Sequence, residues 1–197
     1  RTSDIWIFDV DPRGAAASQR RLTTHLGRDG SPRWSPDGRL IAFVGRRDGD
    51  ETPQLYTIAP DGGEARRVTR LSTGVSAIQW LPDSRRVAFV SLVWPDLATD
   101  DEQRARLAER AASKVKAVAV EATAFRYWDH WMADGRVPRL FVVDVETGGA
   151  RDVLAEYALQ LFPFDESRSL SAEFYDIAPD GDEVAIVCDL SQDPGSH

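Results

Sequence analysis

The aromatic segment 124–131 holds the densest group of side chains that could do chemistry in this sequence. It combines a guanidinium, a carboxylate and an imidazole at Arg126, Asp129 and His130. Such groups can bind an anion and exchange protons near neutral pH, which would give a polar site along a substrate path or at a domain contact. Strand-like alternation offers another interpretation, because it puts Asp129 on the face opposite Arg126 and His130. The segment would then be a strand whose aromatic side chains pack between sheets, and both interpretations stay open.

Catalytic and cofactor motifs are absent from the sequence. No Gly-x-Ser-x-Gly occurs, and His25, His130 and His197 lie in unrelated contexts, so no serine-hydrolase triad is predicted. The single cysteine, Cys188, and these histidines lack zinc-site spacing, and there is no glycine-rich nucleotide loop. We therefore predict no catalytic residue, no metal site and no bound cofactor within this chain.

The composition narrows the classes of partner. The chain has 197 residues, a formal net charge of -8 and 42% apolar residues, which is an ordinary globular mixture. No basic stripe suggests nucleic acid, and no apolar run approaches the roughly 20 residues of a membrane helix. The acidic loop 48–51 lacks the calcium-loop pattern and is predicted to be a solvated hairpin tip. A soluble protein of the cytoplasm or periplasm is expected, and its oligomeric state stays open.

An internal repeat organises the chain. A turn motif with Pro-Asp at its centre occurs in three segments, Trp34–Val44, Trp80–Val90 and Ile177–Val187. Asp37 and Asp83 are 46 residues apart, and the third copy follows 97 residues after the second, which is about two periods or one period with an insertion. Proline presets φ, aspartate hydrogen-bonds the backbone ahead of it, and glycine accepts a positive φ. Each motif is therefore predicted to join two antiparallel strands.

A second motif, predicted to be a third strand, interleaves with the first. It reads Ile5–Val10, Gln54–Ala59 and Arg139–Asp144, and a short charged segment follows each copy. Four strands per period of 46 residues is typical of a propeller blade. The predicted fold class is all-β, a partial β-propeller of four-stranded antiparallel blades with one helical insertion.

The strand pattern divides the chain into blades. We expect a half-blade over 3–26, a blade over 30–72, a blade over 75–155 and a half-blade over 172–189. The third of these segments contains an insertion over 94–138. On this division the chain begins and ends in mid-blade, as a segment of a larger ring would.

A helix is predicted across residues 101–117 of the insertion. Asp100 and Asp101 can cap its start. The residues that recur at helical spacing are Leu107, Ala111, Val115 and Val118. The helix is interpreted either as a surface decoration or as an element that projects toward a partner domain or a substrate path.

The repeat Trp34–Phe43 resembles the propeller repeats of TolB-like proteins and of the prolyl oligopeptidase family. The order of Phe125–Trp131, Ala133–Gly135, Arg139–Asp144 and Tyr175–Gly181 resembles the N-terminal propeller of bacterial acylaminoacyl-peptidase and dipeptidyl-peptidase-like members of that family. The resemblance covers nearly the whole chain.

The resemblance implies a parent serine peptidase in which this propeller covers a C-terminal α/β-hydrolase domain of the same chain. The propeller would admit short peptide substrates without doing chemistry, and acidic residues of the insertion would attract a peptide's cationic N-terminus. Some family members bind that amine with paired glutamates, but Glu102, Glu109 and Glu121 include no adjacent pair, so the role stays unassigned. The alternative is a TolB-like or WD40-like protein-binding scaffold without enzymatic activity.

Overall fold

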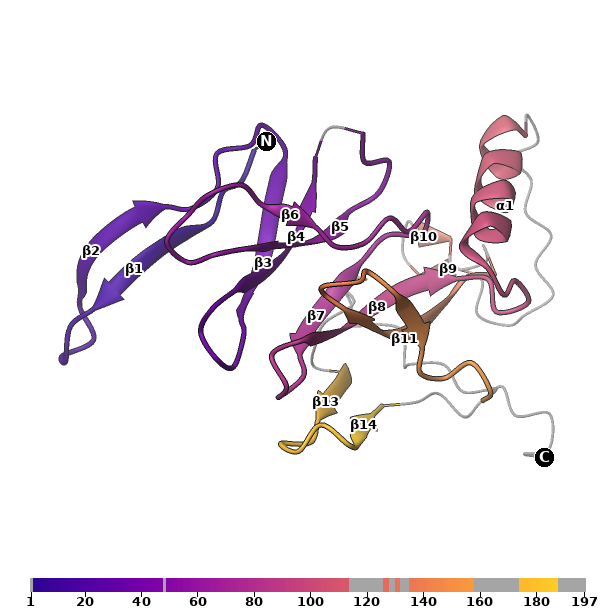
Figure 1. Ribbon diagram of the computed structural model, residues 1–197. Helices are drawn as coiled ribbons and strands as arrows, with labels where there is room; N and C mark the ends of the chain where they lie inside the picture. The colour runs from indigo at the N-terminus through magenta and orange to yellow at the C-terminus, as the bar shows by residue number, and fades with distance from the viewer. Residues whose placement is uncertain are drawn as a thin grey trace.

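The computed structural model describes residues 2–47, 49–113, 126–127, 130–131, 135–157 and 174–187. Over these residues two four-stranded antiparallel sheets stand side by side, flanked by two-stranded hairpins and accompanied by one helix (Figure 1). This arrangement confirms the predicted fold class, a partial β-propeller of four-stranded blades with a helical insertion. Within the same residues, no helix has the length and apolar character needed to cross a bilayer.

The first sheet follows one copy of the Pro-Asp repeat. Its strands, in spatial order, are β3 (Arg28–Trp34), β4 (Ile41–Arg46), β5 (Gln54–Ile58) and β6 (Arg66–Arg67). In the turn between β3 and β4, Gly38 has a φ of 72°, and the Asp37 carboxylate accepts a hydrogen bond from the Arg39 N–H at 3.1 Å. These are the roles that the sequence predicts for the aspartate and the glycine of the motif.

The second sheet is interrupted in sequence but not in space. Its strands, in spatial order, are β12 (Ala150–Asp152), β11 (Val137–Asp144), β8 (Arg86–Val93) and β7 (Ser76–Trp80). Between β8 and β11 the chain forms α1 (Asp100–Ala112), β9 (Arg126–Tyr127) and β10 (His130–Trp131). Even so, β8 and β11 pair along their whole length, from Val93 opposite Val137 to Arg86 opposite Asp144.

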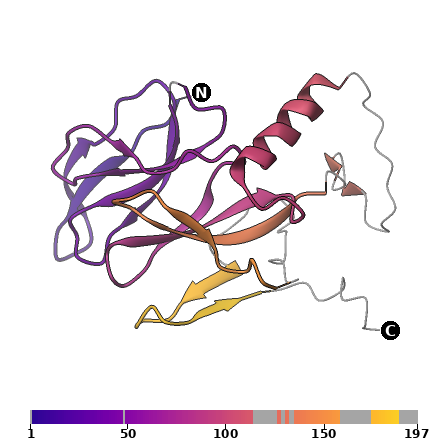
Figure 2. The same ribbon diagram turned by 45° about the vertical axis from the view of Figure 1, so that its right-hand side comes forward.

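A hairpin lies on each side of the two sheets. The first joins β1 (Trp6–Val10) to β2 (Ala16–Arg21), and the second joins β13 (Tyr175–Ile177) to β14 (Val184–Ile186). Figure 2 shows the β13–β14 hairpin beside the second sheet, on the side away from the first sheet.

Apolar clusters fill the spaces between neighbouring sheets. Ile5, just before β1, packs with Phe43 of the first sheet. Leu55 packs with Phe89 of the second sheet, and Leu140 packs with Tyr175 of the second hairpin. Each large apolar side chain buried in this way contributes about 1.5–3 kcal/mol of transfer free energy. The faces of successive sheets therefore hold the propeller segment together.

The sequence-based alignment of the third strands is wrong by one residue. That alignment matched Ile5 with Gln54, whereas the structure matches Ile5 with Leu55. The Ile5 N–H donates to Thr23 Oγ1 at 3.0 Å, and the Leu55 N–H donates to Thr69 Oγ1 at 2.9 Å, one repeat later. Apolar character alone could not fix this register, because neighbouring positions of these strands are apolar too.

The acidic loop 48–51 is not simply a solvated tip. Asp50 is buried, where it accepts a hydrogen bond from the Tyr56 hydroxyl at 2.5 Å and forms an ion pair with Arg67 at 2.8 Å. Burial and the hydrogen bond to Asp50 raise the pKa of Tyr56. The prediction failed because β5 and β6 bring a phenol and a guanidinium to this loop, and sequence proximity does not reveal them.

Candidate functional site

Helix α1 begins with a capping box at Thr99, one residue before the predicted cap. The Thr99 hydroxyl accepts from the Glu102 N–H at 3.3 Å, and the Glu102 carboxylate accepts from the Thr99 N–H at 2.9 Å. The hydrogen bond from the Thr99 hydroxyl and that from its N–H lower the pKa of Glu102. Asp100 instead ties the helix to the β6–β7 connection by accepting from the Ser72 N–H at 2.7 Å.

Gln103 anchors α1 to the segment that leaves β8. Its side chain is buried, accepts from the Trp94 N–H at 3.0 Å, and donates to the Trp94 carbonyl at 2.8 Å and the Leu97 carbonyl at 3.2 Å. A glutamine amide can satisfy a backbone donor and a backbone acceptor at once. Here it bonds the N–H and the carbonyl of Trp94, the first residue after β8, which has left the sheet. The sequence analysis missed this residue, because a glutamine within a polar helix gives no signal of burial.

Three arginines surround the indole of Trp94, which is 4% exposed. The guanidinium carbons of Arg106 and Arg110, both on α1, lie 5.6 Å from the ring, and that of Arg136 lies 5.5 Å away. Guanidinium groups stack favourably on indole, so the cluster fastens the helix to the start of β11. The expected acidic character of the insertion holds for the first turn of α1, whereas its later turns carry arginines.

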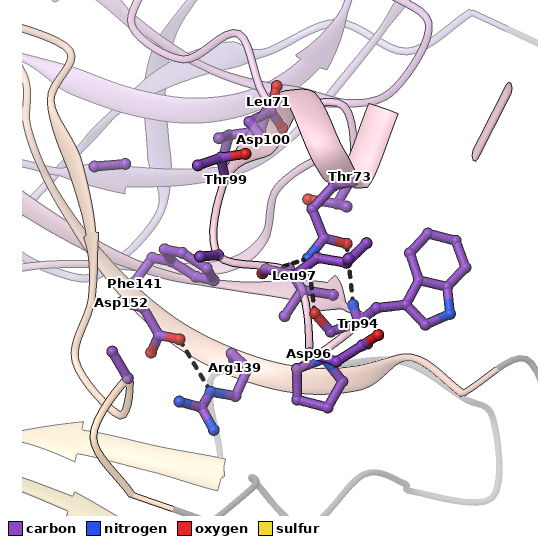
Figure 3. A pocket seen from close by; sticks show the side chains of 16 residues that line it. Leu71, Thr73, Trp94, Asp96, Leu97, Thr99, Asp100, Arg139, Phe141 and Asp152 are labelled. Atoms are coloured by element: carbon purple, nitrogen blue, oxygen red, sulfur yellow. Dashed lines mark hydrogen bonds and ion pairs between the residues drawn. The ribbon is translucent and has the colours of Figure 1, made fainter. Parts of the chain in front are cut away.

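A cavity of about 390 Å³ lies between the start of α1 and the second sheet (Figure 3). Thr99 and Asp100 lie on the helix side, and Arg139, Phe141 and Asp152 lie on the sheet side. Apolar side chains from the β6–β7 connection and from the segment after β8 complete the walls. The helical insertion thus creates a concave site that the sheet alone would not have.

Arg139 links several segments at the cavity wall. It forms an ion pair with Asp152 at 3.0 Å and donates to the Leu154 carbonyl and to the Tyr157 carbonyl, the latter at 3.1 Å. A buried guanidinium needs such partners, because an unpaired charge in the interior is costly. We interpret Arg139 as the residue that fixes the chain after β12 against β11. The sequence analysis recognised it only as part of a strand.

The polar side chains of the cavity are already engaged in hydrogen bonds and ion pairs. Among the described residues that line it there is no serine, cysteine or histidine. Its carboxylates already have partners, with Asp96 bound to Arg106 at 2.9 Å and Asp100 bound to Arg104 at 2.6 Å. The described part of the chain also contains no cluster of three or more metal-ligating side chains.

Arg126, Asp129 and His130, the predicted polar site, lie mostly beyond what the structure describes. The backbones of Arg126 and His130 fall in β9 and β10, and Asp129 lies outside the described residues. The strands pair antiparallel, with Arg126 opposite Trp131, so the predicted single strand is instead a hairpin. Alternation of side chains does not distinguish one long strand from two short paired strands, because both are rich in aromatic residues. The polar site itself stays a prediction.

The first strands of successive sheets form a further polar surface. Arg33 of β3, Gln79 of β7 and Asp176 of β13 occupy corresponding positions of the repeat. The Gln79 amide donates to Asp176 at 3.0 Å, and the Trp80 indole N–H donates to the Arg33 carbonyl at 2.9 Å, so the three strands are neighbours. In a propeller such first strands face the central channel.

Matched irregularities shape two of these first strands. Ser31 in β3 and Ala77 in β7 have φ values of 52° and 51°, and each lies where the pairing register with the next strand shifts. Residues other than glycine rarely adopt this conformation, so its repetition marks a bulge that the fold imposes twice. Neither position is a glycine, so the sequence gives no signal of the bulge.

The comparisons with known proteins point to peptidases and to TolB. The chain is 29% identical over 157 residues to the uncharacterized peptidase YuxL of Bacillus subtilis and 27% identical over 139 residues to dipeptidyl-peptidase 5 of Porphyromonas endodontalis. These matches cover 80% and 71% of this chain. A shorter match, 45% identical over 63 residues, covers 32% of this chain and 13% of the Tol-Pal system protein TolB of Bordetella pertussis. No protein-family model matches the chain.

The solved structures support the fold. Oligogalacturonate lyase of Vibrio parahaemolyticus superposes with a TM-score of 0.52 at 16% identity, over 90% of this chain and 37% of that one. The chain spans only 22% and 18% of the two peptidases. Its relatives are therefore peptidases and TolB-like propeller proteins, and the predicted resemblance to a propeller segment of prolyl oligopeptidase family peptidases is confirmed.

Proposed function

We propose that this chain is the non-catalytic propeller segment of a serine peptidase and controls which peptides reach a catalytic α/β-hydrolase domain of the same parent chain. The observation that carries the proposal is the match to two peptidases over most of this chain but about a fifth of theirs. A segment with that relation to a peptidase contributes a domain rather than the whole enzyme.

The chemistry of the main cavity supports a role without catalysis. Its carboxylates and its guanidinium are engaged in ion pairs or in bonds to backbone groups, and no serine, cysteine or histidine lines it among the described residues. A hydrolase needs a nucleophile, a base within hydrogen-bonding reach and an oxyanion site. Selection of substrates needs only a rigid wall, which packed antiparallel sheets provide.

The polar row on the first strands is the part of this segment proposed to face peptide substrates. Gln79 and Asp176 hold each other in place, and Arg33 lies on the adjacent strand. A rigid polar lining admits an extended peptide and excludes a folded one by size. Longer peptides should therefore be cleaved more slowly than short ones by the parent enzyme.

Cleavage of a matched series of short and long peptides by the parent protein tests this role. We expect Gln79→Ala and Asp176→Ala to raise the rate for long peptides severalfold relative to dipeptidyl substrates. Arg39→Ala, a change at an 86% exposed side chain in the β3–β4 turn, is the matched control and should leave the ratio unchanged. Unchanged ratios in all three variants would count against gating by these strands.

A second candidate is a TolB-like binding scaffold with no enzyme attached. The 45% identity to TolB over 63 residues favours it, because that identity exceeds the identity to either peptidase. The parent gene distinguishes the two candidates. A hydrolase domain with Gly-x-Ser-x-Gly on the same polypeptide supports the peptidase, and its absence supports the scaffold.

A further inference from the structure

The two four-stranded sheets carry a stacked aromatic pair at the same place. Phe43 and Phe89 hold the same position of the Pro-Asp repeat. Tyr56 lies opposite Phe43 and stacks on it with ring centroids 5.6 Å apart, and Phe141 lies opposite Phe89 and stacks on it at 5.4 Å. Phe141 therefore corresponds to Tyr56, and the two rings mark the same place in consecutive spaces between sheets.

Beside the first sheet the chain itself fills this place. Asp50, from the β4–β5 loop, is buried, accepts from the Tyr56 hydroxyl at 2.5 Å and forms an ion pair with Arg67 at 2.8 Å. The guanidinium of Arg47 lies 4.9 Å from the Tyr56 ring and forms an ion pair with Asp29 at 2.9 Å. The walls there are a phenol and guanidinium groups, and the group that they enclose is a carboxylate.

Beside the second sheet the corresponding walls are apolar. Phe141 has no hydroxyl, and Val93 follows Arg47 by 46 residues, at the same position of the repeat. After β8 the chain continues into α1 instead of a short loop to the next strand. The cavity of about 390 Å³ lies at this place, with Phe141, Val93 and Leu71 in its walls (Figure 3). The position that Asp50 fills in one sheet is thus a cavity in the next.

The charged groups of this cavity compensate one another. Asp152, which lies opposite Phe141 as Arg67 lies opposite Tyr56, forms an ion pair with Arg139 at 3.0 Å. The other two carboxylates among the described lining residues are also paired with arginines. A charged ligand would have to displace one of these pairs, because an unpaired charge away from water is costly. A neutral apolar group can lie against the walls and leave every pair intact.

We propose that this cavity binds an apolar side chain of a peptide, of the size of phenylalanine or leucine. An apolar cavity of about 150 Å³ holds a benzene ring, so about 390 Å³ accommodates such a side chain with part of its backbone. Phe141 offers an aromatic surface that its stacking on Phe89 holds in place. The lining residues Pro95 and Ala150 are exposed, so the cavity opens to solvent. That the ligand is a peptide rests on the proposed function, whereas its apolar character rests on the cavity.

Binding of neutral and charged amino-acid analogues to the chain tests the proposal without hydrolysis. The probes are N-acetyl-L-phenylalaninamide, N-acetyl-L-lysinamide and N-acetyl-L-aspartate α-amide, followed by the backbone amide shifts of isotope-labelled protein. We expect the phenylalanine analogue to shift the amides of Leu71, Phe141 and Ala150 and to bind at least tenfold more tightly than either charged analogue. No saturable shift at these amides, or equal or tighter binding of a charged analogue, would overturn the proposal.

Filling the cavity is the second test. Ala150 is exposed and lines the cavity, so Ala150→Phe should occupy it and weaken binding of the phenylalanine analogue at least tenfold. Ala111→Phe, at an exposed alanine of α1 outside the lining, is the matched control and should leave the affinity unchanged. Unaltered binding in an Ala150→Phe variant that keeps the amide shifts of β4 and β5 would count against this site. Failure of the peptidase assignment would instead appear in active-site labelling of the parent protein, which these titrations do not involve.

Discussion

Gln103→Ala should release helix α1 from the second sheet. The substitution removes three hydrogen bonds of a buried side chain. The Trp94 carbonyl keeps the hydrogen bond that it accepts from the Leu97 N–H at 3.1 Å, whereas the Trp94 N–H loses its bond to the Gln103 side chain. A buried backbone group left unsatisfied costs about 1–3 kcal/mol. The lost bond at the Trp94 N–H therefore predicts that the docked helix is destabilised by about 1–3 kcal/mol.

Amide hydrogen exchange within α1 measures this loss directly. Each 1.4 kcal/mol changes an equilibrium about tenfold, so exchange from the undocked state should accelerate roughly 5- to 140-fold. Strands β4 and β8 should keep their protection, because the helix packs outside the clusters that join the sheets. Peptides from the helix and the strands, followed by mass spectrometry in one experiment, separate local from global opening.

Arg104→Ala is the matched control in the same helix. Arg104 forms ion pairs with Asp100 at 2.6 Å and Asp101 at 2.5 Å, and its side chain is 53% exposed. Exposed pairs of this kind contribute less than about 1 kcal/mol, which predicts less than about fivefold faster exchange. Equal effects of Gln103→Ala and Arg104→Ala would refute the assignment of Gln103 as the anchor.

Three further predictions concern other parts of the fold. Glu102, whose pKa the cap lowers, stabilises α1 fully above its ordinary value of 4.5 and loses this effect as the pH falls through the lowered pKa. Protection of the first turn, measured as exchange relative to the intrinsic rate at each pH, should therefore fall below pH 4.5 in the native chain and change less in Glu102→Gln. Tyr56→Phe removes the hydrogen bond to buried Asp50 and should lower the free energy of unfolding in urea by about 1–3 kcal/mol, whereas Tyr157→Phe, at an exposed residue, should change it by less than about 0.5 kcal/mol. Ala77→Val places a branched side chain at a φ of 51° and should cost about 1–3 kcal/mol by the same assay, while Ala77→Gly should cost less.

The sequence was sufficient to predict the architecture because the repeat is local. Pro-Asp turns determine their own geometry within a few residues, and Gly38, Ser84 and Gly181 all adopt the positive φ that the motif implies. The charged short strand that ends each period and the apolar strands before it then define the order of a blade. These features lie close together in the sequence and do not depend on contacts between distant segments.

The candidate site was much less predictable, because it depends on contacts between distant segments. Gln103 becomes important only when α1 lies over the segment after β8, and Arg139 only when the chain after β12 folds back onto β11. In the sequence, a single glutamine in a polar helix or a single arginine in a strand cannot be distinguished from an exposed surface residue. The predicted site at Arg126, Asp129 and His130 relied on local density of reactive side chains, and it remains to be tested.

Active-site labelling of the parent protein tests the central claim most directly. A fluorophosphonate probe reacts with the activated serine of a serine hydrolase and can be located by peptide mapping. The account predicts that the purified parent protein is labelled on a serine outside residues 1–197, and that the chain 1–197 alone is not labelled. A labelled serine within residues 1–197, or a parent protein that the probe does not label, would contradict it.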